Sequence, residues 1–291
     1  MASLLSRGWG YRKPPLGARL NRSHPLTLGL VGRWVMNEGG GNTVYDCAGI
    51  HNGTLASGQA WGSGPFGTTV VFDGVDDVIT INDPNIVEGV NQLSVSCWIQ
   101  SSLLAQAGPR TIIAWAGAAD RPFALELGST ELIQFWVTNT LSVDVIADSN
   151  SALTDNAPHH VVGVYNGANV LLYIDGVLQT DQPAQTGLTP SITAAFNVAR
   201  STADWAGIID DVRVYDRTLS HQEIHWLYQE PFADFQPVRK VFGNVTAAAV
   251  RRFLLTRGFS PQWARWMPLV ATISPFAWII RRRIRLMGTT P

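Results

Sequence analysis

Oxygen-bearing side chains in one polar loop and one late strand are the first candidates for chemistry. Asp46 lies in the segment VYDCAGIHNG, where Gly49 and Gly53 let backbone carbonyl oxygens turn inward. Calcium takes about six to eight oxygen ligands from such flexible loops. We therefore predict a structural Ca²⁺ held by Asp46 and Asp210, with Glu38 as a weaker third ligand. The alternative is that Asp46 caps its loop and Asp210 makes a hydrogen bond inside the fold.

Catalysis is not predicted from the sequence. Retaining glycoside hydrolysis needs two carboxyl groups about 5 Å apart. The nearest candidates, Glu126 and Glu131, are separated by Gly128 and Ser129 and so lie across a predicted turn. The sequence also lacks a nucleophile elbow, a phosphate-binding loop and an HExxH zinc motif. We predict a non-catalytic domain, with a hydrolase as the least favoured class.

Aromatic side chains in predicted loops could bind carbohydrate. Trp61, Trp115 and Trp205 stand in such segments, and an exposed indole can stack on the apolar face of a sugar. The competing interpretation is packing in the core or between subunits, and the sequence favours it over sugar binding.

The charge of the chain is strongly divided along its length. Residues 1–25 carry a net charge of +5, residues 231–291 carry +9, and residues 26–230 carry −15. Basic terminal arms on an acidic body suggest binding to something negative, such as nucleic acid, a membrane surface or the acidic body of a neighbouring subunit. Nucleic acid is the least favoured of these, because the RRRIR run near the end is unspecific.

The first 28 residues are predicted to form a basic, extended arm. Glycines and prolines interrupt any helix, and no apolar stretch is long enough for a signal peptide. We therefore expect a protein made and kept in a cytoplasm, at least until a larger assembly leaves the cell. Trp9 and Tyr11 are predicted anchors for a partner.

Residues 230–291 are predicted to be a basic and apolar extension, helical in part. The apolar run 266–280 has 15 residues interrupted by Pro268 and Pro275, whereas a membrane-spanning helix needs about 20. A spanning helix, an interfacial anchor and docking on a protein all remain open, and docking is favoured because exposed aromatics need burial. The predicted partner-binding residues here are Trp263, Trp266, Phe276, Trp278, Arg281, Arg282 and Arg283.

Between these arms, residues 29–229 are predicted to form one all-β domain. About a dozen short alternating segments are separated by turn signals such as Asn166-Gly167 and Asp175-Gly176, which is typical of an antiparallel sandwich. The domain closes with Ala206–Tyr228, a strand followed by a short helix. Ser220 and Glu223 form a capping box at the start of that helix.

Five segments in order also carry a family resemblance: GLVGRWVMNEGGGNTVYDCAGIHNGTL, FDGVDDVITI, LSVSCWIQ, HHVVGVYNGANVLLYIDGVLQ and GIIDDVRVYDRTLSHQEIHWLY. Residues 29–228 resemble the laminin-G-like, concanavalin A-like jelly-roll domains of the lectin/glucanase superfamily. The resemblance implies a two-sheet jelly roll that often binds carbohydrate or protein, often with a structural calcium. It assigns calcium ligands to Asp46 and Asp210, although Cys47 stands where a small hydroxyl residue is usual.

These observations lead to one favoured function and one alternative. The chain has a lectin-like fold and basic arms, but no secretion signal and no set of catalytic residues. These features fit a surface or decoration protein of a virion, with a bacteriophage capsid as the favoured case. Its arms would clamp a shell protein or copies of itself, and its jelly roll would face outward and bind glycans weakly. The alternative is a cellular carbohydrate-binding module, soluble or associated with a membrane through the C-terminal segment.

Overall fold

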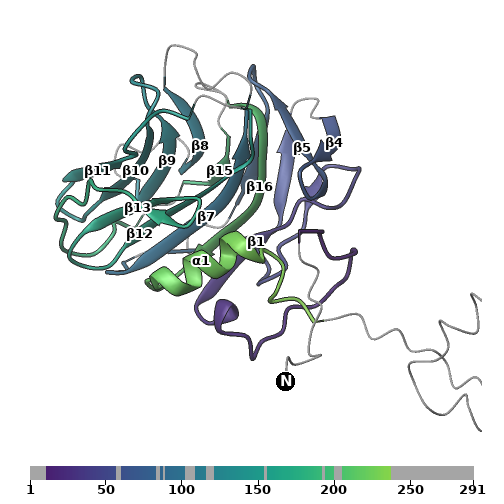
Figure 1. Cartoon of the computed structure of the whole chain (residues 1–291), viewed down its shortest axis with the longest axis horizontal. Coiled ribbons are helices and arrows are strands. Elements are labelled where there is room, and N and C mark those ends of the chain that lie inside the picture. The colour runs from purple at the N-terminus through teal and green to yellow at the C-terminus, as the bar shows by residue number, and fades with distance from the viewer. Residues whose placement is uncertain are drawn as a thin grey trace, which may run out of the picture. The chain divides into compact units, whose positions relative to one another are not determined.

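The computed structural model describes residues 11–56, 60–82, 86–87, 89–101, 109–115, 121–153, 156–191, 194–199 and 205–236. In this part of the chain, antiparallel strands form two sheets that pack face to face (Figure 1). The all-β jelly-roll fold predicted from the sequence is confirmed.

One sheet, here called the covered sheet, has the strand order β14-β13-β12-β7-β16-β5-β4, with β1 paired to β16. Its strands are β1 (Leu30–Trp34), β4 (Ala60–Gly64), β5 (Gly67–Asp73), β7 (Leu93–Gln100), β12 (His159–Tyr165), β13 (Val170–Ile174), β14 (Val177–Leu178) and β16 (Ala206–Tyr215).

The second sheet, here called the open sheet, has the order β11-β10-β9-β8-β15-β6-β3-β2. Its strands are β2 (Thr43–Val44), β3 (Gly53–Ala56), β6 (Val78–Ile81), β8 (Arg110–Trp115), β9 (Phe123–Leu127), β10 (Ile133–Thr138), β11 (Asp144–Asp148) and β15 (Phe196–Val198).

The main core lies between the two sheets, because alternate side chains of each strand point to opposite faces. On β12, Val161 belongs to this core, whereas Val162 and Val164 belong to a separate cluster on the other face. Gly163 makes room for the ring of Phe135 on β10, since a Cβ at Gly163 would lie 2.3 Å from that ring. The two sheets therefore approach closely at this point.

The closing segment has the predicted form. On β16, Val212 and Val214 enter the core, while Tyr215 lies on the opposite face. Helix α1 (His221–Gln229) begins at Ser220, whose hydroxyl accepts the Glu223 N–H, and the Glu223 carboxylate accepts the Ser220 N–H. The capping box fixes the direction in which the chain leaves the strand.

A second apolar cluster lies on the outer face of the covered sheet, under α1 and the short 3₁₀ helix η1 (Pro25–Thr27). Figure 1 shows α1 lying across β7, β16 and β1. Ile224 and Leu227 of α1 and Leu26 of η1 are buried here. The face of a sheet that would otherwise meet water is thus covered by the two ends of the described chain.

The terminal segments belong to this same unit. Leu20 forms a β-bridge with Phe235, the Asn21 N–H donates to the Asp234 carbonyl at 2.7 Å, and the Gln236 N–H donates to the Arg19 carbonyl at 2.8 Å. The described residues between 11 and 236 belong to one compact unit. The boundaries predicted at 28/29 and 229/230 therefore cross a packed region, and the described part of the predicted arm, residues 11–28, lies on its own domain.

Four buried charges connect β1, β16 and the segment after α1. The Arg33 guanidinium donates to Asp211 at 3.0 Å and to Asp234 at 2.5 Å, and Arg213 donates to Asp211 at 2.7 Å. Both guanidiniums also donate to the Pro231 carbonyl. All four side chains are at most 1% exposed. Burial would raise the pKa of Asp211, but Arg213 and Arg33 hold it below its usual value.

Buried His160 is expected to make stability fall in mild acid. Its Nε2 lies 2.8 Å from the Ser96 hydroxyl, and burial lowers its pKa to about 3. The unfolded chain takes up this proton near pH 6.5. The contribution of His160 to stability is therefore full above about pH 6.5 and is lost as the pH falls toward 3, by at most about 1.4 kcal/mol per pH unit.

Urea unfolding at a series of pH values measures this slope. His160→Gln, which cannot titrate, should remove this loss. The dependence left then comes from His24, whose pKa burial also lowers, and from Asp210 and Glu38, whose pKa values burial raises and which act in the opposite direction. An unchanged slope in the variant would contradict the assignment to His160.

Candidate functional site

The predicted calcium ligand Asp46 is used as a loop cap. Its Oδ1 accepts the N–H groups of Arg33 at 2.9 Å and Ala48 at 2.8 Å, and its Oδ2 accepts the His51 N–H at 3.1 Å. Its side chain is fully buried. Backbone N–H groups thus bind both carboxylate oxygens of Asp46. This is the loop-capping role that the sequence left open as the alternative to calcium binding.

The other two predicted ligands have different partners. Asp210 Oδ1 lies 2.5 Å from the Lys13 ammonium, and burial raises the pKa of Asp210 to about 7 while Lys13 opposes the rise. Glu38 Oε1 accepts the Tyr45 N–H at 2.9 Å, and burial raises the pKa of Glu38. Each of the three carboxylates is thus bound to different protein donors, while Glu38 Oε2 and Asp210 Oδ2 are buried without a hydrogen-bond partner among the described residues.

A separate acidic turn joins β5 and β6. Carboxylate oxygens of Asp73, Asp76 and Asp77 lie within 4.8 Å of one another. Asp77 accepts the Asp73 N–H and Asp73 accepts the Val75 N–H, both at 2.8 Å. These bonds give Asp73 and Asp77 a structural role in the turn, as their residue type indicates.

Two of the three tryptophans predicted to bind sugar are core residues, which corrects that prediction. Trp115 is fully buried with its ring against Phe123 and Phe196, and Trp205 is 1% exposed with Nε1 donating to the Ile208 carbonyl at 3.2 Å. Neither ring can reach a sugar at the surface. Trp61 is half-buried beside the core, and its Nε1 donates to the Gly41 carbonyl at 3.0 Å.

The open sheet instead presents another tryptophan. On β10, Ile133, Phe135 and Val137 enter the core, so Gln134 and Trp136 point to the outer face. The neighbouring strands contribute side chains in register: Gln134 pairs with Glu126 of β9 and with Asp148 of β11. We call the outer-face group Arg121, Glu126, Gln134, Trp136 and Asp148 the β10 patch.

Charges and the aromatic ring of the β10 patch are held in fixed positions. The Arg121 guanidinium lies 5.0 Å from the centre of the Trp136 ring and donates to Glu126 Oε1 at 2.6 Å. The Gln134 amide donates to Asp148 Oδ1 at 2.7 Å. Arg121, Gln134, Trp136 and Asp148 are all half-buried. The patch therefore combines a partly exposed indole with carboxylate and amide groups on β9, β10 and β11 and a guanidinium just before β9.

This combination can bind a polyhydroxylated ligand. The apolar face of a sugar can stack on an indole, while fixed polar groups bind the hydroxyls and set orientation. Sequence reasoning missed Trp136, although its signal was present: it stands in the polar phase of the alternating segment IQFWVT. An aromatic residue in that phase marks the exposed face of a strand.

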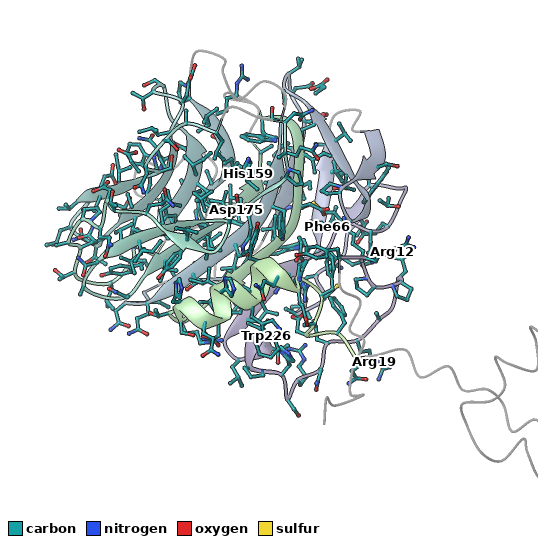
Figure 2. The ribbon with its side chains drawn as sticks, in the orientation of Figure 1. Arg12, Arg19, Phe66, His159, Asp175 and Trp226 are labelled. Atoms are coloured by element: carbon teal, nitrogen blue, oxygen red, sulfur yellow. The ribbon has the colours of Figure 1, made fainter. Side chains whose placement is uncertain are left out.

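A groove of about 580 Å³ lies elsewhere, between the N-terminal segment and the β4–β5 turn. Arg12 and Phe66 both line it, and Figure 2 shows them on the same side of the molecule. The exposed ring of Tyr11 is stacked on Phe66 with centroids 6.2 Å apart. Tyr11, a predicted partner anchor, is therefore held at the surface by its own domain.

The remaining predicted partner-binding residues lie outside the described residues: Trp9, Trp263, Trp266, Phe276, Trp278, Arg281, Arg282 and Arg283. Within the described ranges, no helix has the length and apolar character needed to span a bilayer.

Comparison with known proteins identifies the family. A family model described as concanavalin A-like lectin/glucanases superfamily matches residues 73–225, more than half of the chain. The chain belongs to this superfamily. The match includes β9, β10 and β11, so the β10 patch lies on strands of the superfamily fold. A search of curated proteins found no significant match.

Solved structures share the superfamily fold at low identity. Domain 4 of AbnA, a GH43 extracellular arabinanase from Geobacillus stearothermophilus in complex with arabinotriose, aligns with a TM-score of 0.56 and 19% identity over 69% of this chain and 98% of that domain. The binding domain of Paraclostridial Mosquitocidal Protein 1 aligns with a TM-score of 0.57 and 13% identity, over 70% and 52% of the two chains.

The binding domain of Botulinum Neurotoxin DC, in complex with SialylT, aligns with a TM-score of 0.54 and 17% identity, over 69% of this chain and 51% of that one. The chain thus spans about half the length of the toxin domains. The two toxin neighbours are described as binding domains, and at such identities all three structures show the fold alone.

Proposed function

We propose that this chain binds a glycan without transforming it, through the β10 patch. The observation that carries the proposal is the partly exposed Trp136 ring of β10, in a lectin-like fold, with the guanidinium of the Arg121–Glu126 pair over one face of the ring. Support also comes from the fold neighbours that bind arabinotriose and SialylT. The carboxylates of the patch are paired with Arg121 and Gln134, which suits recognition of hydroxyl groups better than proton transfer.

A glycan array probed with the full chain and with Trp136→Ala tests the proposal. We expect the full chain to bind a defined set of glycans and the variant to bind them at least about 10-fold more weakly, the equivalent of about 1.4 kcal/mol. Trp61→Ala is the matched control, since Trp61 is also half-buried but lies on β4 of the other sheet. Circular dichroism checks that both variants fold.

Binding that survives in Trp136→Ala but is lost in Trp61→Ala would move the site to the tryptophan predicted from the sequence. Failure of the full chain to bind any glycan would contradict the proposed function itself.

Decoration of a virion is a second candidate, favoured by the charge division between the −15 body and the +9 C-terminal residues. Residues 11–28 lie on their own domain, so clamping onto a shell would fall to residues 1–10 and 237–291, outside the described ranges. Light scattering in low and high salt tests this role: a multi-copy species that dissociates in salt supports it, and a monomer in both contradicts it.

A further inference from the structure

A buried ammonium group lies where three elements of the covered sheet meet. Lys13 Nζ lies 2.5 Å from Asp210 Oδ1 and donates to the backbone carbonyls of Thr68 at 2.5 Å and Met36 at 3.0 Å. The side chain of Lys13 is 4% exposed and that of Asp210 is fully buried. The three N–H donors of the ammonium thus match three oxygen acceptors.

The oxygen atoms around this group are positioned by unusual backbone. Met36, which follows β1, has a φ of 55°, and Asp211, next to Asp210, has a φ of 45° within a bulge of β16. Positive φ in such residues costs about 1 kcal/mol or more and persists only where surrounding contacts impose it. One carboxylate and two carbonyls converging on a point form a cage suited to a hard cation.

The N-terminal segment is held so that Lys13 enters this cage. The Lys13 N–H donates to the Phe66 carbonyl at 3.3 Å, and the Asn37 amide donates to the Pro14 carbonyl at 2.7 Å. Pro14 and Pro15 limit the conformations of the segment directly after Lys13. The position of Lys13 is therefore fixed by a backbone segment that is hydrogen-bonded to the domain.

We propose that the Lys13 ammonium is the resident cation of this domain and stands in for the calcium ion that the family resemblance assigns to Asp210. Its single positive charge neutralises the buried Asp210 carboxylate, and its donors bind the carbonyls that would otherwise face a metal. Asp210 Oδ2 is buried without a hydrogen-bond partner in the part of the chain that the structure describes, and the positive charge of Lys13 on Oδ1 repels a Ca²⁺ ion from the same carboxylate. The domain then folds and stays stable without a divalent metal.

Thermal unfolding of the full chain in excess EDTA and in excess CaCl₂ tests this inference. The melting temperature of the native sequence should be the same in both. Lys13→Met, which keeps the chain length but removes the charge, should lower it by about 5 °C or more in EDTA. Arg12→Met is the control. Arg12 is the cation next to Lys13 in the sequence and is exposed, so this variant should melt at the same temperature as the native sequence.

A second variant covers the case in which Lys13→Met fails to fold. Lys13→Met/Asp210→Asn removes both charges, so it should be more stable than the single variant. The proposal is overturned if CaCl₂ raises or EDTA lowers the melting temperature of the native sequence. It is also overturned if Lys13→Met melts like the native sequence, or if the double variant is no more stable than the single one.

Discussion

Replacing Asp234 with asparagine is expected to lower the free energy of unfolding by about 3 to 5 kcal/mol. The buried network holds two guanidiniums and two carboxylates, so it is neutral as it stands. Asparagine keeps the shape of Asp234 but leaves Arg33 and Arg213 with one carboxylate between them. An uncompensated charge that is almost fully buried is costly because neither water nor a counter-ion reaches it.

Urea unfolding of a double-mutant cycle measures this effect. Arg33→Met added to Asp234→Asn restores neutrality around Arg213 and Asp211, so the double variant should lose less stability than the two single losses added together. Glu230→Gln, an exposed carboxylate four residues away, should change the free energy by about 0.5 kcal/mol at most. Additive losses, or a mild effect of Asp234→Asn alone, would contradict a coupled network.

A chain cut after Gln229, at the domain boundary predicted from the sequence, is expected not to fold cooperatively. The cut removes Asp234 and the Pro231 carbonyl from the buried network, together with Phe232 and Phe235, which are 0% and 3% exposed. Each phenylalanine contributes about 1.5 to 3 kcal/mol by burial. Added to the network, this loss is comparable with the whole stability of a typical domain, about 5 to 15 kcal/mol.

A chain ending at Gln236 is the matched control, since it keeps every one of these contacts and lacks only residues 237–291. Near-ultraviolet circular dichroism and thermal unfolding distinguish the two chains. Equal melting temperatures for the two chains would show that the segment 231–236 does not stabilise the folded domain.

Much of the fold could be predicted because its signals are local. The alternation in β16, the capping box of Ser220 and Glu223, and the hairpin turn at Asp175-Gly176 each depend on residues close together in the sequence. The two-sheet jelly roll also followed from the family resemblance of segments in the same sequence. The strands predicted from alternation and α1 lie where the sequence indicates, whereas Trp61 and Trp115, expected in loops, lie in β4 and β8.

The candidate site and the buried charges depend on long-range contacts. Arg33 pairs with Asp234 and Lys13 pairs with Asp210, and the partners in each pair are about 200 residues apart in the sequence. No local sequence pattern predicts either pair. Composition drew attention to the basic arm as a whole, but it could not show that Lys13 turns inward. The residue types of Trp115 and Trp205 fit either a core or a sugar site, and burial decided between them.

A crystal structure of the full chain with the strongest glycan from the array tests the central claim most directly. We predict one sugar ring stacked on Trp136, with hydroxyl groups within hydrogen-bond distance of Arg121, Glu126 or Gln134. A glycan bound instead in the groove of Tyr11 and Phe66, with the outer face of β10 bare, would contradict the assignment of the β10 patch.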